Sequence, residues 1–192
     1  MSAVPQHILD LVAQRRHGDD DSLRQILTAL VPRVRNLVRY LVRGDRHVDD
    51  IAQEALLEIL RALDGYRGEG AFEGWVHRIV TRVVFAELKA RRADEATFAP
   101  EEQEPGPGLW VVGQDDRPDD YLERRRLAEA LDKLPDDQRY VVVMHHAVQM
   151  SAPEIAEALG VPLETVRSRL RLGRTKLRSL LGQEGSDVGG EP

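Results

Sequence analysis

Apolar side chains recur every three or four positions over most of the chain, the spacing that gathers side chains on one face of an α-helix. In the first ninety residues this spacing predicts four helical stretches. Their apolar positions are Ile8, Leu11 and Val12; Leu23, Ile26, Leu27, Leu30, Val34, Leu37, Val38 and Leu41; Ile51, Ala55, Ile59 and Leu63; and Trp75, Ile79, Val83 and Leu88. Pro32 lies inside the second stretch and is expected to kink or restart that helix. No segment shows the sustained alternation of a β-strand.

The helical spacing returns after residue 120. A first helix is predicted by Leu122, Leu127, Leu131 and Leu134 and ends at Pro135. A second contains Val141 to Met144 and ends before Ser151.

Residues 94–120 separate these two helical regions and hold four prolines and three glycines. Such a segment buries too little apolar surface to offset the entropy lost on ordering. We therefore predict an all-α protein with two small helical domains, residues 1–93 and 121–182. A flexible acidic linker at 94–120 joins them, and residues 183–192 form a disordered tail.

Ser151 to Gly160 carries the signals of a short helix with defined ends. Ser151 followed by Glu154 fits a capping box, in which each residue satisfies an amide of the other. Gly160 suits the left-handed position that often ends a helix. A new helix is expected to start near Leu163, so the two helices predict a helix-turn-helix.

The second helix of this pair concentrates basic residues. Six lie within twelve positions: Arg167, Arg169, Arg171, Arg174, Lys176 and Arg178. Val166, Leu170 and Leu177 supply the apolar face, and Glu164, Arg167, Ser168 and Arg171 fall on the opposite side at 100° per residue. That is the side on which a recognition helix presents donors to DNA. The alternative is a solvated basic face on a purely structural helix.

The charge of the whole chain hides this basic character. The formal net charge is −6, but residues 93–120 hold nine acidic side chains against one arginine, and residues 182–192 hold three more. The remainder carries a net charge of +5. The chain outside the linker and tail is therefore basic, as expected for a protein that binds the phosphate backbone of a nucleic acid.

Several classes of protein are excluded or disfavoured. The chain has no cysteine, which excludes disulfides and thiolate sites. No secretion signal and no 18-residue apolar run are present, so we expect a cytoplasmic protein without membrane insertion. We find no phosphate loop and no nucleophile–base pair, and we predict no enzyme, no small-molecule substrate and no cofactor. His145 and His146 lack a third ligand, and "DDDS" at 19–22 fits a helix cap, so no metal site is expected.

The motifs together resemble a known family. "ALDKLPDDQRYVVVMHHAVQMSAPEIAEALGVPLETVRSRLRLGRTKLR" is similar to region 4 of bacterial sigma factors. "DDIAQEALLEILRAL" followed by "FEGWVHRIVTRVVFAELKARR" is similar to region 2. Two such regions without a region 3 are typical of the extracytoplasmic-function (ECF) group of the sigma-70 family. The resemblance implies a region 2 helical bundle and a region 4 helix-turn-helix.

The resemblance also implies a function and partners. Members bind core RNA polymerase, through the clamp helices of the β′ subunit and the flap of the β subunit, and direct it to promoters. Region 2 recognises and melts the −10 element, and region 4 binds the −35 element. An anti-sigma factor is a further implied partner.

Three sets of site residues follow from the resemblance. Polymerase docking is expected at Asp50, Gln53, Glu54 and Leu57, although Asp49 and Asp50 could instead only favour a helix N-terminus. Contacts to −10 DNA are expected at Tyr66, Arg67, Phe72, Arg78, Arg82 and Lys89, with Trp75 as a core anchor. Contacts to −35 DNA are expected at Thr165, Arg167, Ser168, Arg171 and Arg174, of which Thr165 and Arg174 would contact the backbone.

This sequence departs from the family pattern at three places. Arg82 stands where relatives often have asparagine in the −10 region. Pro162 replaces a frequent serine or threonine cap, and Arg171 and Leu172 replace a frequent aromatic or histidine followed by arginine. The −10 base preference and the register of the last −35 base contacts therefore do not carry over from such relatives.

Two other functions are compatible with parts of the sequence. A conventional DNA-binding regulator with a helical sensor domain would explain the helix-turn-helix, but not the "DDIAQE" segment or the aromatic and glycine-rich loop. A sigma-like decoy that only sequesters an anti-sigma factor would not need Arg167, Ser168 and Arg171.

Overall fold

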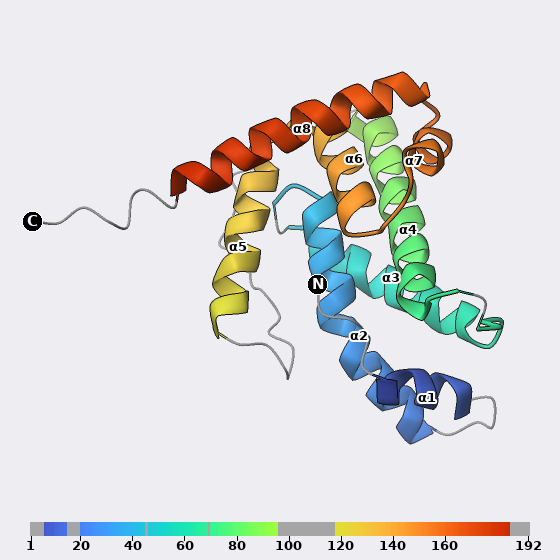
Figure 1. Ribbon diagram of the computed structural model, residues 1–192. Helices are drawn as coiled ribbons and strands as arrows, with labels where there is room; N and C mark the ends of the chain where they lie inside the picture. The colour runs from blue at the N-terminus through green and yellow to red at the C-terminus, as the bar shows by residue number, and fades with distance from the viewer. Residues whose placement is uncertain (1–5, 15–19, 45, 69, 96–117, 185–192) are drawn as a thin grey trace, which may run out of the picture. The chain divides into compact units, whose positions relative to one another are not determined.

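A computed structural model of the chain describes residues 6–14, 20–44, 46–68, 70–95 and 118–184. Within these ranges the regular secondary structure is entirely helical (Figure 1). The helices are α1 (Gln6–Gln14), α2 (Asp20–Leu41), α3 (Val48–Leu63), α4 (Phe72–Glu95), α5 (Pro118–Asp132), α6 (Asp136–His146), α7 (Ala152–Leu159) and α8 (Leu163–Glu184). The predicted all-α fold is confirmed.

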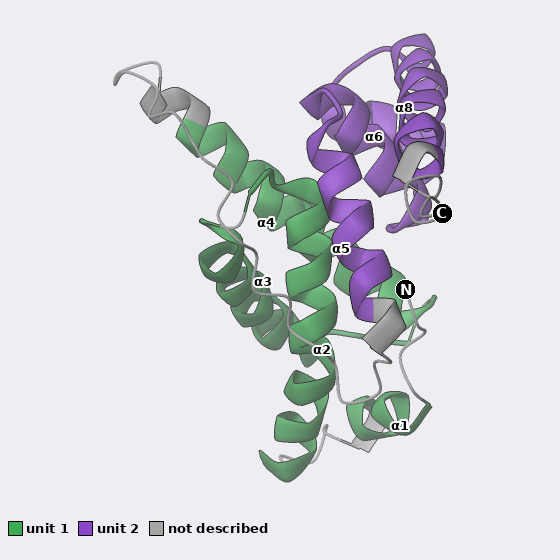
Figure 2. Ribbon diagram, turned by 90° about the vertical axis from the view of Figure 1, so that its left-hand side faces the viewer, with its two compact units in different colours: residues 1–114 green, residues 115–192 purple. Residues whose placement is uncertain are grey.

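The chain divides into two compact units, Met1–Gln114 and Asp115–Pro192 (Figure 2). Most of the predicted linker, residues 96–117, and most of the predicted tail, residues 185–192, lie outside the described residues. Their boundaries stay predictions. The described ends of the linker belong to helices, because α4 includes residues 94–95 and α5 begins at Pro118, and residues 183–184 of the tail belong to α8.

In the first unit, α2 packs against α1, α3 and α4, and α3 also packs against α4. The predicted apolar face of α3 is buried as expected: Ile51, Ala55, Ile59 and Leu63 are at most 5% exposed. Helix α2 does not restart at Pro32 but runs unbroken through it. The buried Leu30 and Val34 are four residues apart across the proline, so one continuous helix keeps both on the same face.

The buried face of α4 is rotated from the predicted one. Phe72, Val76, Val80 and Val84 are at most 3% exposed. Of the predicted positions, Ile79 is buried as expected, at 6% exposed, whereas Trp75, Val83 and Leu88 are only half-buried. Trp75, Ile79 and Val83 are four residues apart, as are the buried residues, so the spacing predicts the helix but does not decide which of two neighbouring apolar stripes meets α2 and α3.

The second unit is organised around α8, which packs against α5, α6 and α7. Val141 to Met144 lie in α6, as predicted, and together with Tyr140 they are buried. Helix α8 crosses α6 at Gly173, where an added Cβ would lie 2.7 Å from Val142 Cγ2 and 3.3 Å from the carbonyl oxygen of Gln138. A side chain at this position would force the two helices apart.

The segment that follows α6 contains a left-handed residue that its sequence does not predict. Gln149 has a φ of 63°, in the left-handed region that normally favours glycine. The amide of Met150 donates to Met144 O at 3.0 Å, and the Gln149 side chain donates to His146 O at 2.7 Å. These two bonds close the helix and fix the position of its last residue, His146.

Candidate nucleic-acid and polymerase interfaces

Helices α7 and α8 form the predicted helix-turn-helix. The Ser151 amide donates to Glu154 Oε2 at 2.8 Å, and the Glu154 amide donates to Ser151 Oγ at 3.4 Å, which completes the capping box. Gly160 ends α7 with φ 64° and ψ 35°, and the Val161 amide donates to Ala156 O at 3.1 Å. Both helix ends, and therefore the direction of α8, are set by these local bonds.

The inner face of α8 attaches it to the unit. Val166 is fully buried, Leu170 is 7% exposed and Leu177 is half-buried, broadly as predicted. Arg169 points to α6, where its Nε lies 2.9 Å from Asp137 Oδ2. Arg169 therefore joins α8 to α6, and because its side chain is only 27% exposed, it is not part of the outer basic face.

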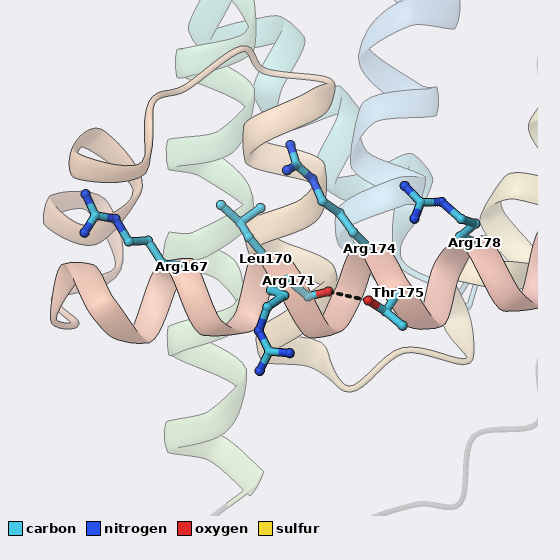
Figure 3. A pocket seen from close by; sticks show the side chains of 6 residues that line it. All are labelled: Arg167, Leu170, Arg171, Arg174, Thr175 and Arg178. Carbon is cyan, nitrogen blue, oxygen red and sulfur yellow. Dashed lines mark hydrogen bonds between the residues drawn. The ribbon is translucent and has the colours of Figure 1, made fainter.

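The outer face of α8 carries a stripe of arginines, which we call the arginine stripe. Its members follow one another at intervals of four, three and four residues: Arg167, Arg171, Arg174 and Arg178. All four are exposed, and with Leu170 and Thr175 they line one hollow on the helix surface (Figure 3). Eleven residues of helix span about 16 Å, so the stripe can follow several phosphates of a DNA groove.

Three members of this stripe were predicted to contact −35 DNA, and Arg178 was not among them. The signal for Arg178 is its distance of four residues from Arg174, the same interval that separates Arg167 from Arg171. Of the other predicted −35 residues, Ser168 is exposed and Thr165 is half-buried.

Two residues of the arginine stripe have partners within the unit. Arg167 Nη1 donates to Glu164 Oε1, one turn earlier on α8. Arg174 Nε donates to His146 Nε2, at the end of α6, over 2.8 Å. The sequence suggested for His146 only a role as a metal ligand, which was not expected, and it gave no sign of this contact.

The predicted polymerase-docking residues share one exposed face of α3. Asp50, Gln53 and Glu54 are exposed, and Leu57 is 39% exposed, on the side opposite the buried Ile51, Ala55 and Ile59. An exposed leucine among polar residues has the mixed character of a protein–protein contact.

Neighbouring charges of α3 belong to contacts within the first unit. Asp49 accepts from Arg35 Nε of α2 at 2.6 Å. Arg61 donates to Glu58 Oε1 at 2.5 Å and lies 3.5 Å from Glu54 Oε1. Asp49 therefore joins α2 to α3, whereas Asp50 stays on the outer face.

The loop between α3 and α4 holds a cluster of three aromatic rings. The Tyr66 ring centroid lies 5.2 Å from that of Phe72 and 5.1 Å from that of Trp75. Tyr66 Oη donates to Gly70 O at 3.0 Å, and Gly68 and Gly70 adopt positive φ angles of 77° and 82°. The glycines let the loop fold back tightly enough for this bond.

Exposure within this aromatic cluster differs from the sequence expectation. Phe72, expected to contact −10 DNA, is 3% exposed. Trp75, expected to be a core anchor, is half-buried, as is Tyr66.

The remaining predicted −10 residues are exposed basic side chains of α4 and of the loop before it. Arg78, Arg82 and Lys89 are exposed on one side of α4, at offsets of four and eleven residues, and Arg67 is exposed in the loop. Arg82 Nη2 lies 3.9 Å from Glu58 Oε2 of α3.

Three histidines differ in their surroundings. His77 is 5% exposed, and burial lowers its pKa to about 4. Glu73 Oε1 lies 3.9 Å from His77 Nε2, too far for a hydrogen bond, so burial dominates. His145 Nδ1 contacts Met150 O at 3.0 Å. Partial burial, then Arg174 and His145, lower the pKa of His146 below its ordinary value.

Across the described ranges, no three His, Asp or Glu side chains are grouped as a metal site would need. In the same ranges, no helix is long and apolar enough to span a membrane.

Comparison with known proteins assigns both units. The family model described as Sigma-70 region 2 matches residues 26–93, and that described as Sigma-70, region 4 matches residues 124–177. The ECF RNA polymerase sigma-E factor of Escherichia coli K12 is 30% identical over 170 residues, covering 83% of this chain and 86% of that protein. The chain belongs to the ECF group of the sigma-70 family.

Other ECF sigma factors extend the comparison. SigW of Bacillus subtilis is 26% identical over 88% of this chain and 94% of its own length. SigE of Mycolicibacterium smegmatis is 33% identical over 78% of this chain, but the match spans only 58% of SigE.

Solved structures of similar fold contain a second protein. CnrH in complex with the cytosolic domain of CnrY has 26% identity and a TM-score of 0.50, over 90% of this chain and 96% of the other. The sigma factor RpoE of Bartonella quintana, in complex with the anti-sigma factor NepR, has 20% identity and a TM-score of 0.56, over 83% and 96%. The second likeness concerns the fold alone.

As an ECF sigma factor, the chain acts in promoter-directed initiation of transcription. The predicted family, function and two-region fold are confirmed.

Proposed function

We propose that α8 binds the −35 element through the arginine stripe. The observation that carries this proposal is the alignment of four exposed arginines along a helix whose start and direction are fixed by α7 and its caps. Arg167, Ser168 and Arg171 are nearest the N-terminal end of α8, the end that a recognition helix presents to base edges. Thr165, Arg174 and Arg178 contact phosphates.

The −10 element binds the surface formed by the α3–α4 loop and the basic side of α4. Tyr66 offers a half-buried ring that can stack on an unpaired base. Phe72 supports Tyr66 from the core side, since its own ring is buried and packs edge-on against Tyr66. Arg67, Arg78, Arg82 and Lys89 hold the strand by its phosphates.

Core RNA polymerase docks on the exposed face of α3. Asp50, Gln53, Glu54 and Leu57 contact the clamp helices of the β′ subunit, and the second unit contacts the flap of the β subunit. The exposed Leu57 supports this assignment, because packing within the first unit leaves 39% of its surface uncovered. An anti-sigma factor is a further partner, and one that covers these surfaces would silence the protein without any enzymatic step.

Transcription reconstituted from purified parts tests this proposal. The full chain is mixed with core polymerase and a DNA library randomised over the promoter, and transcripts are sequenced to recover the preferred −35 and −10 elements. A sigma factor gives transcripts only when core polymerase and the chain are both present. A free-standing regulator would bind a palindromic duplex without polymerase, and a decoy would give no transcripts.

A further inference from the structure

The bond between Arg174 and His146 joins α8, the second helix of the helix-turn-helix, to α6, which precedes the motif. Arg174 comes from the middle of α8, and His146 is the last residue of α6, 28 positions earlier. Their nitrogens, Arg174 Nε and His146 Nε2, are 2.8 Å apart. Figure 3 shows the Arg174 side chain extending from the same side of α8 as Arg167 and Arg178.

The chemistry of the two groups fixes the state of the histidine. A guanidinium has only donors, so His146 Nε2 must accept the bond with a lone pair. The His146 ring is therefore neutral and carries its proton on Nδ1. A second proton would remove the acceptor and place two positive charges side by side.

The bond also fixes what Arg174 can offer to DNA. Because Nε is engaged, the two terminal nitrogens with their four N–H groups are the donors available for a phosphate. An arginine held in this way loses less side-chain freedom on binding than one that is unattached. His146 is itself fixed at the end of α6, where its carbonyl accepts from Gln149 Nε2 at 2.7 Å.

We propose that His146 is a positioning residue for the phosphate contact of Arg174, and that protonation of His146 releases Arg174 and weakens DNA binding by α8. This proposal rests on the proposed contact between the arginine stripe and the −35 element. It extends that contact by making its strength depend on pH.

The groups around His146 support the direction of this effect. His145 of α6 lies edge-on to it, with ring centroids 4.9 Å apart, and Arg174 approaches from α8. Both oppose protonation, and partial burial acts in the same sense to lower the pKa of His146. No described residue of α5 or α7 is among the groups that alter this pKa.

The first experiment measures the pair itself in the free full-length chain. The pKa of His146 is measured by NMR in the wild type and in Arg174→Ala. We expect this pKa to rise when Arg174 is removed, because a neighbouring positive charge is lost. An unchanged pKa would overturn the pairing, whatever the chain does with DNA.

The second experiment measures the role of the pair in binding. The probe is the promoter duplex recovered from the randomised library, and the protein is the holoenzyme with core polymerase. His146→Ala should weaken binding about three- to tenfold, as expected for one hydrogen bond. His146→Gln should restore it, because the amide oxygen can accept from Arg174 Nε without titrating.

A double-mutant cycle separates positioning from general damage. In the Arg174→Ala background, His146→Ala should have no further effect. In the matched Arg178→Ala background it should keep its full effect, since Arg178 belongs to the same stripe. Equal losses in both backgrounds would overturn the positioning role, and no loss from Arg174→Ala alone would instead refute the DNA contact on which the proposal rests.

The pH profile completes the test. Relative to His146→Gln, wild-type binding should weaken as pH falls through the pKa measured for His146. Binding that strengthens with acid in the wild type alone would overturn the proposal, because it would show that protonated His146 contacts phosphate itself.

Discussion

At the scale of single residues, arginines of the same helix have different roles according to the face on which they lie. Arg169 is fastened to Asp137, whereas Arg167, on the other side of α8, is 60% exposed and shares its charge only with Glu164. An exposed pair of this kind contributes little to stability, so Arg167 can exchange Glu164 for a base edge at low cost.

Base reading and phosphate contact by α8 can be separated by substitution. Arg167→Ala should cost about 1–3 kcal/mol of binding and relax the preference at one −35 position. Arg174→Ala should weaken all sequences alike and reduce the salt dependence. Lys176→Ala, an exposed charge of α8 outside the arginine stripe, is the matched control. The affinities of the holoenzyme for the recovered promoter and its single-base variants test this. If both arginine substitutions lowered the affinity for every sequence equally, base reading by Arg167 would be contradicted.

His77 predicts how the stability of the protein depends on pH. Its pKa is about 4 in the folded protein, against 6.5 for an unperturbed histidine. The unfolded chain therefore binds the proton first, and the stability given by neutral His77 is complete above pH 6.5 and is lost as pH falls towards 4. At pH 5 the loss should approach about 2 kcal/mol.

Denaturant unfolding of the full chain at pH 7 and pH 5, followed by circular dichroism, measures this loss. The variant His77→Gln serves as control, because it cannot titrate in this range. An equal loss in the variant would show that another group is responsible.

At the scale of helices, the position of α8 depends on one close crossing. Gly173 leaves no room for a Cβ, because Val142 Cγ2 would lie 2.7 Å away. Gly173→Ala should therefore destabilise the second unit by about 1–3 kcal/mol through overpacking, despite the better helix propensity of alanine.

Gly182 supplies the matched control on the same helix. An added Cβ there meets nothing within 4 Å, so Gly182→Ala should leave stability unchanged or raise it by up to about 1 kcal/mol. Thermal unfolding of both variants measures the difference. Equal melting temperatures for the two variants would refute the close crossing.

Local rules account for the elements that the sequence predicted well. Ser151, Glu154 and Gly160 act on their own backbone or on neighbours within four residues, so their bonds could be predicted without knowing the fold. The choice of buried stripe on α4 needed the neighbouring helices, because two adjacent stripes are both apolar. The left-handed Gln149 has no glycine to signal it, and the two bonds that accompany it, from Met150 to Met144 and from Gln149 to His146, have no sequence pattern that predicts them.

The candidate site also has features that local sequence predicts and features that depend on the packing of the helices. The arginine stripe and the exposed face of α3 follow from helical periodicity, and both could be predicted from sequence. The bond from Arg174 to His146 could not, because it depends on where α6 ends relative to α8. Gly173 lies at that crossing, but nothing in the sequence distinguishes it from any other glycine inside a helix.

At the scale of the whole molecule, the protein is two compact units with complementary tasks. The first unit presents the α3 face and the aromatic loop, and the second presents the arginine stripe. A sigma factor must engage polymerase and DNA at once. In the proposed account, the α3 face is the surface that distinguishes this protein from a DNA-binding regulator that acts alone.

Binding of core polymerase by a chain altered on the α3 face tests the central claim most directly. Asp50→Arg combined with Leu57→Ala should abolish co-purification with core polymerase and transcription from the recovered promoter. Circular dichroism should be unchanged, because both side chains lie outside the buried face. Asp10→Arg, an equal change of charge on the exposed side of α1, should bind core polymerase like the wild type. A folded α3 variant that binds core polymerase with wild-type affinity would contradict the account.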